Sequence, residues 1–268
     1  MTTDTPISDP LRVERDGAIV TLVYNRPQAL NAINVPMAQA LLAALQDIAQ
    51  DDSVRALVLR GEGRAFMAGG DLQTLQRDPL AGVDALLAPL NQAMLLLAGL
   101  NAPVIAQVQG VAVGAGLSLM LQADFVLAAE GATFNLAYIN LGASCDVAAS
   151  WALPRWVGLR RALEISMLGE TLDAAQAQQM GLLNRVLPAD ALEAEVRRLA
   201  QRLADGPTQA LGHMRRLMRR LMRASLETDL ETQLGAEWQA FRACAPTDDL
   251  RAGIDAFFQK QPARFTGR

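Results

Sequence analysis

Two glycine-rich segments carry the residues best suited to chemistry on a carbonyl group. The first spans residues 61–72, directly after an apolar run, and the second spans residues 109–117. Small residues let a ligand approach the backbone, and the free N–H groups at the start of a helix attract developing negative charge. Two such amides aimed at one oxygen form an oxyanion hole. Either segment alone is also explained by tight turns and close packing, and neither matches a P-loop or a Rossmann pattern.

Asp146 is the second candidate for chemistry. It is the only charged side chain between Glu130 and Arg155. Apolar surroundings raise the pKa of a carboxyl group and make it a stronger base, so Asp146 is a candidate for proton transfer. The alternative is structural, because aspartate is also favoured at the residue before a helix, and a helix is expected here through residues 148–151.

The elements that must position these residues alternate between strands and helices. Residues 11–24 predict two strands around an Asp16-Gly17 turn. Further strands are predicted at 56–59, 104–108, 125–128 and 133–136, and helices at 35–50, 83–100 and from the second glycine-rich segment through Gln122. This alternation is typical of an α/β fold with crossover connections.

The last part of the chain has a different pattern. From Asp146 onward no strand is predicted, and helices are expected at 172–180, 189–203, 208–225, 226–244 and 247–260. The composition changes near Gly206-Pro207. We therefore expect residues 1–205 to form the core domain and residues 206–268 to form a helical region that packs on the core and on a neighbouring subunit.

Composition excludes several classes of protein. The chain has 268 residues, of which 51% are hydrophobic, and a net charge of −4, which argues against a nucleic-acid or anionic-membrane surface. Two cysteines and one histidine cannot supply a four-ligand zinc site or a disulfide framework. The start lacks the pattern of a secretory signal, and the best candidate for a membrane span, residues 104–121, carries three glycines. We expect a cytoplasmic protein without a metal.

Five segments taken in order resemble the enoyl-CoA hydratase/isomerase (crotonase) family over nearly the whole chain. They are residues 26–34, 65–72, 102–117, 179–186 and 256–268. The resemblance implies a crotonase-like spiral of ββα units with a C-terminal helical trimerisation region. It also implies a homotrimer or a dimer of trimers, an acyl-coenzyme A substrate, and no cofactor besides the coenzyme A that belongs to that substrate.

The resemblance also implies roles for individual residues. The oxyanion amides fall on Gly70 and Ala115, the latter in place of the family's usual glycine. Ala29 and Asn31 correspond to the adenine end of the ligand, and Phe257 and Lys260 to residues that reach a neighbour's coenzyme A. The pantetheine and acyl path is implied for Met67, Ala68, Asp71 and Leu72, and the pocket wall for Tyr138 together with residues 83–97 and 141–147.

The sequence departs from the hydratases of this family at two positions. Their paired glutamates correspond here to Ser118 and Tyr138, neither of which is a carboxylate. Asp146 matches instead the aspartate of dienoyl-CoA isomerases and ring-epoxide isomerases. A single carboxylate can move a proton between two carbons, whereas adding water requires the water itself to be held and activated. We therefore predict an isomerase that uses Asp146 as its base.

Three alternatives remain open. The chain could be an enoyl-CoA hydratase, as the family resemblance alone implies. Asp146 could be a nucleophile, as in the aryl-CoA dehalogenases, although the single histidine, His213, lies in the helical region far from it in sequence. The chain could also be a CoA-ester-binding protein without activity, because both glutamates are missing.

Overall fold

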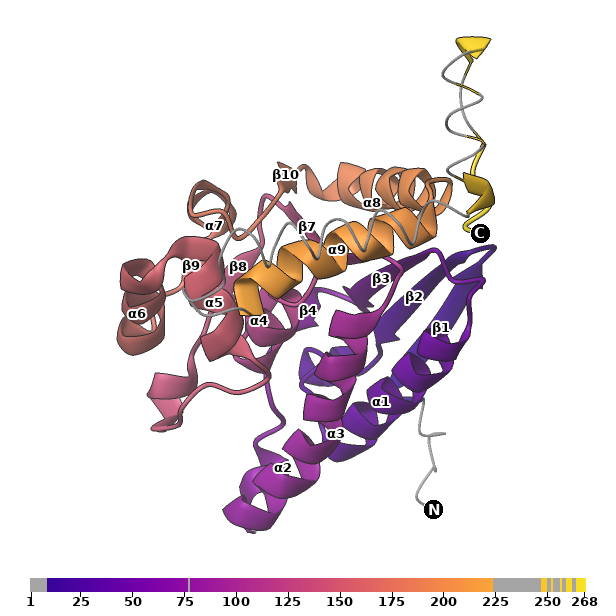
Figure 1. Cartoon of the computed structure of the whole chain (residues 1–268). Helices are drawn as coiled ribbons and strands as arrows, with labels where there is room; N and C mark the ends of the chain where they lie inside the picture. The colour runs from indigo at the N-terminus through magenta and orange to yellow at the C-terminus, as the bar shows by residue number, and fades with distance from the viewer. Residues whose placement is uncertain are drawn as a thin grey trace.

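A six-stranded sheet forms the centre of the computed structural model, which describes residues 9–76, 78–223, 247–249, 252, 256, 259–261 and 264–268. The strand order is β1-β2-β3-β5-β7-β10 (Figure 1). The first pair is antiparallel and the later neighbours are parallel. The strands are β1 (Leu11–Asp16), β2 (Ile19–Tyr24), β3 (Ala56–Gly61), β5 (Val104–Val108), β7 (Phe125–Ala129) and β10 (Arg185–Leu187).

A second, four-stranded sheet has the order β4-β6-β8-β9. Its strands are β4 (Ala65–Met67), β6 (Val111–Val113), β8 (Thr133–Asn135) and β9 (Leu172–Asp173). Strands β4, β6 and β8 each follow a strand of the large sheet directly, and a helix comes after each such pair. This repeat is the predicted spiral of ββα units, so the predicted α/β fold class is confirmed.

The helices complete the spiral and extend it. The α-helices are α1 (Val35–Gln50), α2 (Gln73–Gln76), α3 (Pro79–Gly99), α4 (Ala115–Met120), α5 (Ala149–Val157), α6 (Leu159–Leu168), α7 (Ala174–Gln179), α8 (Ala189–Ala204) and α9 (Thr208–Arg223), and the 3₁₀ helices are η1 (Pro27–Ala29) and η2 (Tyr138–Leu141). The prediction of no strand after Asp146 is wrong, because β9 and β10 lie there. These strands have two and three residues, which is too short for an alternating pattern to be recognised.

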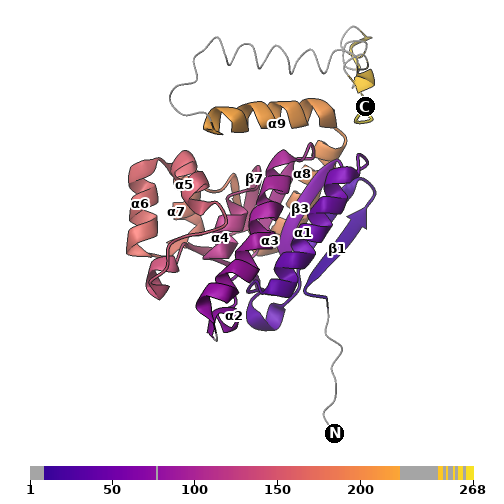
Figure 2. The same cartoon turned by 60° about the horizontal axis from the view of Figure 1, so that its bottom comes forward.

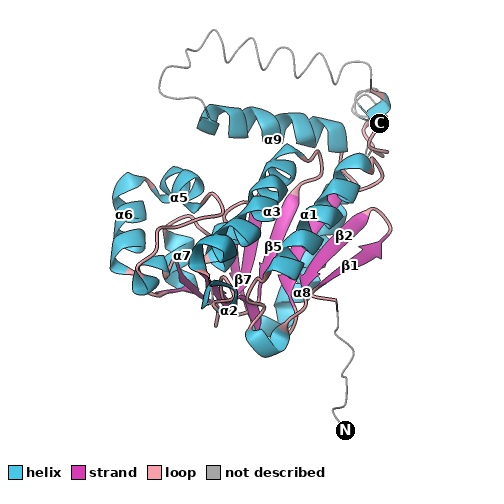
Figure 3. Ribbon diagram, turned by 90° about the horizontal axis from the view of Figure 1, so that it is seen from below, coloured by secondary structure: helices cyan, strands magenta, loops and turns pink. Residues whose placement is uncertain are grey.

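The two faces of the large sheet are covered by different helices. Helices α1 and α3 cover one face, as Figure 3 shows from below, and α8 covers the other. Leu192, Val196, Ala200 and Ala204 recur every four residues and form the buried stripe of α8. Successive strand residues therefore contribute to opposite layers, as Leu57 and Val58 do.

Helix α3 begins at Pro79, before the predicted residue 83, because the Asp78 side chain accepts a hydrogen bond from the Ala81 N–H at 3.1 Å and caps it. Its residues Leu80–Gly99 have the length and mean hydropathy (1.5) of a membrane span, and a third of that window is buried within the protein. This helix contains Pro89 and packs along α1. It is thus an element of the packed fold.

Helix α9 lies alongside the rest of the fold, as Figure 2 shows. Two arginines of this helix bind the core. Arg215 is buried and donates to the Asp124 carboxylate at 2.5 Å and to the Leu97 carbonyl at 2.8 Å. Arg219 donates to the same carboxylate at 2.8 Å. The start of the C-terminal region therefore packs on the core. The predicted helix at 226–244 lies outside the described residues, helix 247–260 lies partly outside them, and contact with a neighbouring subunit stays a prediction.

Candidate active site

The segment that follows β4 presents one backbone amide away from its neighbours. Ile33 forms a parallel bridge with Gly70, in which the Ile33 N–H donates to the Gly69 carbonyl and the Asp71 N–H donates to the Ile33 carbonyl, both at 2.8 Å. In such a bridge the residue between these two groups directs its own N–H to the opposite side. Among the hydrogen bonds of the described residues, none uses the Gly70 N–H.

A second free amide comes from the start of α4. Ala115 is the first residue of this helix, and the preceding Gly114 has φ 53° and makes no side-chain cap. The N–H of a first helical residue has no partner within its helix. Within the described part of the chain, no acceptor is bonded to the Ala115 N–H, whereas the Gly114 N–H donates to Asn135. Ala115 thus offers a donor at the positive end of a helix.

Glycines bring these two segments together. A Cβ placed on Gly69 would lie 3.3 Å from the Val113 carbonyl oxygen and 3.8 Å from the Ala115 nitrogen. Gly116 packs even more closely, because its Cβ would lie 2.2 Å from the Met67 carbonyl oxygen. The packing explanation of the glycines is therefore correct for Gly116. The same close packing places the Gly70 and Ala115 regions side by side.

Asn31 supports this arrangement from inside the protein. Asn31 is fully buried. Its side-chain NH₂ group donates to the carbonyls of Glu62 (2.9 Å) and Ala65 (2.8 Å), and its side-chain oxygen accepts from the Arg26 N–H. Both amide hydrogens are consequently used within the protein. Asn31 ties its loop to the first glycine-rich segment, while the half-buried Ala29 stands at the edge of that loop.

The other residues predicted around the first glycine-rich segment lie in different environments. Asp71 forms an ion pair with Arg26 at 2.8 Å and accepts from the Gln73 N–H, so its carboxylate supports the loop. Met67 is fully buried in the core, Ala68 is half-buried, and Leu72 is 51% exposed. Leu86 of α3, within the predicted wall segment 83–97, lies 3.7 Å from a Cβ built on Gly70.

Ser118, Tyr138 and Asp146 form one hydrogen-bonded chain. The Tyr138 hydroxyl donates to Asp146 Oδ1 in a short hydrogen bond and lies 3.1 Å from Ser118 Oγ. Ser118 belongs to α4, one turn after Ala115, and Tyr138 begins η2. The structure thus joins three side chains that are 20 and 8 residues apart in sequence, and places their chain at the helix that carries the Ala115 amide.

The backbone around Tyr138 and Asp146 is strained. Ala137 (φ 48°) precedes Tyr138, and Val147 (φ 50°) and Ala148 (φ 59°) follow Asp146. Residues with a Cβ are uncommon in this left-handed region and are held there by their surroundings, often at functional sites. These three residues flank the two ends of the hydrogen bond between Tyr138 and Asp146.

Asp146 does not cap the following helix with its side chain. Helix α5 begins after Ala148 without a side-chain cap, and the Asp146 carboxylate is bonded to Tyr138 instead. Burial raises the pKa of Asp146, and the Tyr138 hydrogen bond and its own amide partly oppose that rise. Burial raises the pKa of Tyr138 as well, and so does the nearby Asp146 carboxylate. The capping explanation is therefore wrong for this side chain.

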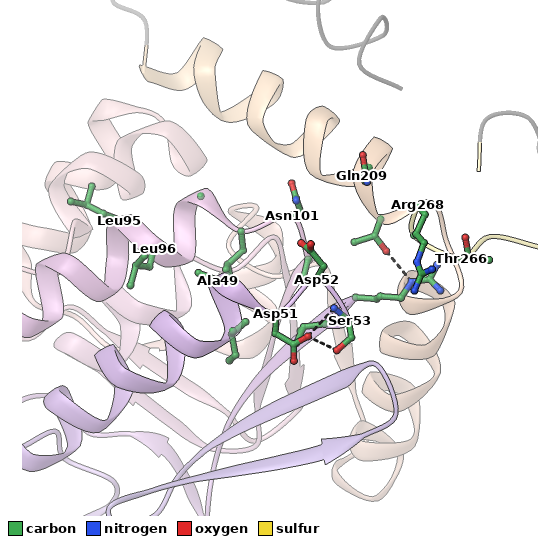
Figure 4. Close-up of a pocket in the computed structure, with 18 residues that line it drawn as sticks. Ala49, Asp51, Asp52, Ser53, Leu95, Leu96, Asn101, Gln209, Thr266 and Arg268 are labelled. Carbon is green, nitrogen blue, oxygen red and sulfur yellow. Dashed lines mark hydrogen bonds between the residues drawn. The ribbon is translucent and has the colours of Figure 1, made fainter. Parts of the chain in front are cut away.

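The remaining predicted residues are at the C-terminus. Lys260 is exposed and has φ 53°, and Phe257 lies outside the described residues. A cavity of about 770 Å³ opens between the ends of α1 and α3, the start of α9 and Thr266–Arg268 (Figure 4). It begins along α3 at Leu95, roughly 14 Å from Leu86 at the helical rise. Leu95 and Leu96, at the end of the predicted wall segment 83–97, line this cavity, but none of the residues predicted individually for catalysis or ligand binding is among its lining residues.

Comparisons with known proteins agree with this arrangement. The family model described as enoyl-CoA hydratase/isomerase matches residues 14–268. The chain is 37% identical to the 1,2-epoxyphenylacetyl-CoA isomerase of Escherichia coli, over 94% of this chain and 97% of that protein. It is 36% identical to the 2,3-dehydroadipyl-CoA hydratase of the same organism, over 96% and 99%.

A solved structure agrees as well. The enoyl-CoA hydratase of Mycobacterium smegmatis superposes with a TM-score of 0.88 at 34% identity, covering 96% of this chain and 98% of that one. Hydratases and isomerases thus both occur among the similar proteins, so these matches do not separate the two reactions. The match over residues 14–268 shows that the chain belongs to the enoyl-CoA hydratase/isomerase family.

Proposed function

We propose that this protein is an isomerase of unsaturated or strained-ring acyl-coenzyme A esters, with Asp146 as its single base. The thioester oxygen would accept hydrogen bonds from the amides of Gly70 and Ala115. The hydrogen-bonded chain of Ser118, Tyr138 and Asp146 carries the proposal. It provides one carboxylate where a hydratase would present two, and within the described residues no second carboxylate acts on Asp146.

The proposed reaction moves one proton. The Asp146 carboxylate removes a proton from an acyl carbon, and the electron pair of that C–H bond moves into the thioester to give an enolate. The two amides stabilise the enolate oxygen, which is where such donors have their largest effect. Asp146, now a neutral carboxylic acid, returns the proton to another carbon as the electron pair moves back, so the double bond has shifted.

The environment of Asp146 suits this role. Because burial raises the pKa of its carboxyl group, the carboxylate is a stronger base than that of an exposed aspartate. Activation of water needs a further group to hold the water, and Ser118 and Tyr138 are already bonded to each other. Hydration, which the name of the E. coli hydratase suggests, is the alternative reaction.

The test is Asp146→Asn, which preserves an oxygen that can accept from Tyr138. We expect the rate of double-bond migration in a 3-enoyl-CoA ester to fall by about 10²–10⁴-fold. Exchange of its acyl protons in D₂O should fall with it, while the ester still binds. Glu130→Gln, at an exposed acid after β7, is the matched control and should retain the activity.

Two outcomes would contradict the proposal. One is full proton exchange and isomerisation by Asp146→Asn. The other is hydration of crotonyl-CoA by the unmodified protein at a rate above isomerisation. A covalent acyl-enzyme at Asp146, detected by mass spectrometry, would favour the dehalogenase-like alternative. Binding without any turnover would favour a non-catalytic protein. The trimer and the absence of a separate cofactor stay predictions. So do the ligand-binding roles of Ala29, Asn31, Met67, Ala68, Asp71, Leu72, Phe257 and Lys260.

A further inference from the structure

The protein has two tyrosines, and their hydroxyl groups have opposite environments. The Tyr24 hydroxyl is buried in the core and has no hydrogen-bond partner among the described residues. The Tyr138 hydroxyl lies between Ser118 Oγ and the Asp146 carboxylate. Only the second hydroxyl is therefore in a position to influence the proposed base.

We propose that Tyr138 is a positioning residue that holds Asp146 Oδ1, so that Oδ2 is the oxygen that takes the proton from the acyl chain and returns it. This inference rests on the proposed function, in which Asp146 is the base. It assigns Tyr138 a role different from the pocket wall predicted from the sequence, because its polar end is directed at the base.

The direction of the hydrogen bonds follows from the chemistry of the three groups. An ionised carboxylate only accepts, so the single Tyr138 hydrogen is used by Asp146. In the 3.1 Å contact with Ser118 the tyrosine oxygen can then only accept, so the one Ser118 hydrogen is shared between that oxygen and the Gly114 carbonyl oxygen at 3.2 Å. The donors thus point from Ser118 through Tyr138 to Asp146, an arrangement in which successive hydrogen bonds strengthen one another.

The hydrogen-bonded chain of Ser118, Tyr138 and Asp146 connects the proposed base to the backbone that carries the two proposed oxyanion amides, of Gly70 and Ala115, which we call the frame. Ser118 lies on α4, the helix that begins with Ala115, and its Oγ is also 3.2 Å from the carbonyl oxygen of Gly114. Tyr138 therefore fixes Asp146 relative to the same helix that is proposed to hold the thioester oxygen. A base held in this way keeps a fixed position relative to both carbons between which the proton moves.

The tyrosine keeps its own proton during the reaction. Its burial and the adjacent Asp146 carboxylate both raise the pKa of Tyr138, so its hydroxyl donates and is not deprotonated. The described groups facing Asp146 are Tyr138 from η2 and Ser118 behind it. Arg155 of the neighbouring helix α5 stacks on Trp151, with 4.4 Å between its guanidinium carbon and the ring centre. The proton that leaves the substrate consequently resides on Asp146.

The test is the pH dependence of isomerase kcat/KM for Tyr138→Phe. Because the Tyr138 hydrogen bond lowers the pKa of Asp146, its removal should move the acid limb of the profile to higher pH. We expect kcat to fall by about 10-fold to 100-fold with little change in KM, since a mispositioned base slows proton transfer. Tyr24→Phe is the matched control and should leave the profile unchanged, because that hydroxyl has no partner in the described structure.

A second variant keeps the test decisive if Tyr138→Phe does not fold. Ser118→Ala removes the donor to Tyr138 and should move the acid limb in the same direction by a smaller amount. The inference is overturned if either folded variant loses rate with an unmoved acid limb, since a merely structural role would give that result. It is also overturned if Tyr138→Phe retains the full rate. Failure of the proposed function would appear separately, as an active Asp146→Asn.

Discussion

The two halves of the candidate site are built in opposite ways. The amides of Gly70 and Ala115 are main-chain groups, fixed by the bridge to Ile33 and by the start of α4. The proposed base, Asp146, lies on the segment between η2 and α5, which we call the base segment and in which residues 142–144 are exposed. Two flanking residues, Ala137 and Val147, adopt left-handed conformations. In the proposed function, the frame formed by the Gly70 and Ala115 amides would hold the thioester, and a separate surface segment would supply the reacting side chain.

Under the proposed function, this difference would let the reaction change within one family. A side chain on the exposed segment can change without disturbing the sheets, whereas a change in the frame affects the core directly. The isomerase and the hydratase of E. coli are almost equally similar to this chain, at 37% and 36% identity. Overall sequence similarity therefore reflects the frame, and the reaction has to be inferred from individual positions outside it, such as Tyr138 and Asp146.

The largest effect on the frame is expected from Ala115→Pro. Proline is tolerated at the first residue of a helix, and Gly114 before it has no Cβ to meet the proline ring. The substitution removes the N–H of residue 115 and leaves the helix in place. We expect kcat to fall by about 10²–10³-fold, as with other lost oxyanion donors, with unchanged circular dichroism.

A proline at the start of another helix provides the control. Ala189→Pro introduces the same residue at the first position of α8, on the far face of the large sheet, and should not change kcat. Ala115→Gly keeps the N–H and should lose far less activity than the proline variant. Equal activity of Ala115→Pro and Ala115→Gly would show that the amide does not act on the substrate.

The next effect concerns the packing that joins the two parts of the frame. In Gly116→Ala the new Cβ would lie 2.2 Å from the Met67 carbonyl oxygen, so α4 must move away from β4. The helix gains up to about 1 kcal/mol from alanine, but overpacking costs about 1–3 kcal/mol, so the variant should be less stable. Urea unfolding measures the difference.

Gly99→Ala is the corresponding control, because a Cβ at this helical residue meets nothing within 4 Å in the described structure. It should leave the free energy of unfolding unchanged or slightly raised. If Gly116→Ala proved as stable as Gly99→Ala, the frame would be more compliant than the contact with Met67 indicates.

The sequence predicts the frame better than the base segment. The core helices and the long strands follow from apolar periodicity, and helix 35–50 and strand 104–108 have the predicted bounds. Strands β4 and β6 were hidden inside the glycine-rich segments, because three residues show no period. Their pairing depends on contacts between segments that are distant in the chain.

The base segment could be located but not built from the sequence. Asp146 stands out as an isolated charge, but nothing in Ala137, Val147 or Ala148 indicates a left-handed backbone, which these residue types rarely adopt. That conformation is imposed by the surrounding fold, and it brings Tyr138 to Asp146. Likewise, asparagine is a residue type that is usually exposed, and only the structure shows that Asn31 is fully buried.

The smallest expected effect is that of Asp146→Asn on thermal stability. It concerns the proposed base alone and not the frame. Folding raises the pKa of Asp146 above its ordinary value of 3.8, so the native state binds this proton more tightly than the unfolded state. The stability from this group is present below that value and is lost as the pH rises through the higher folded pKa. Asp146→Asn removes that loss and should raise the Tm at pH 7.5.

The gain in Tm should shrink as the pH is lowered towards 4, because the carboxyl group of the unmodified protein then becomes neutral too. Thermal melts of both proteins between pH 4 and 8 measure this trend. A variant that is inactive but more stable would show that the buried carboxylate is retained for chemistry at the expense of stability. A lower Tm for Asp146→Asn across this range would mean that the ionised carboxylate, through its bond to Tyr138, stabilises the base segment more than burial destabilises it.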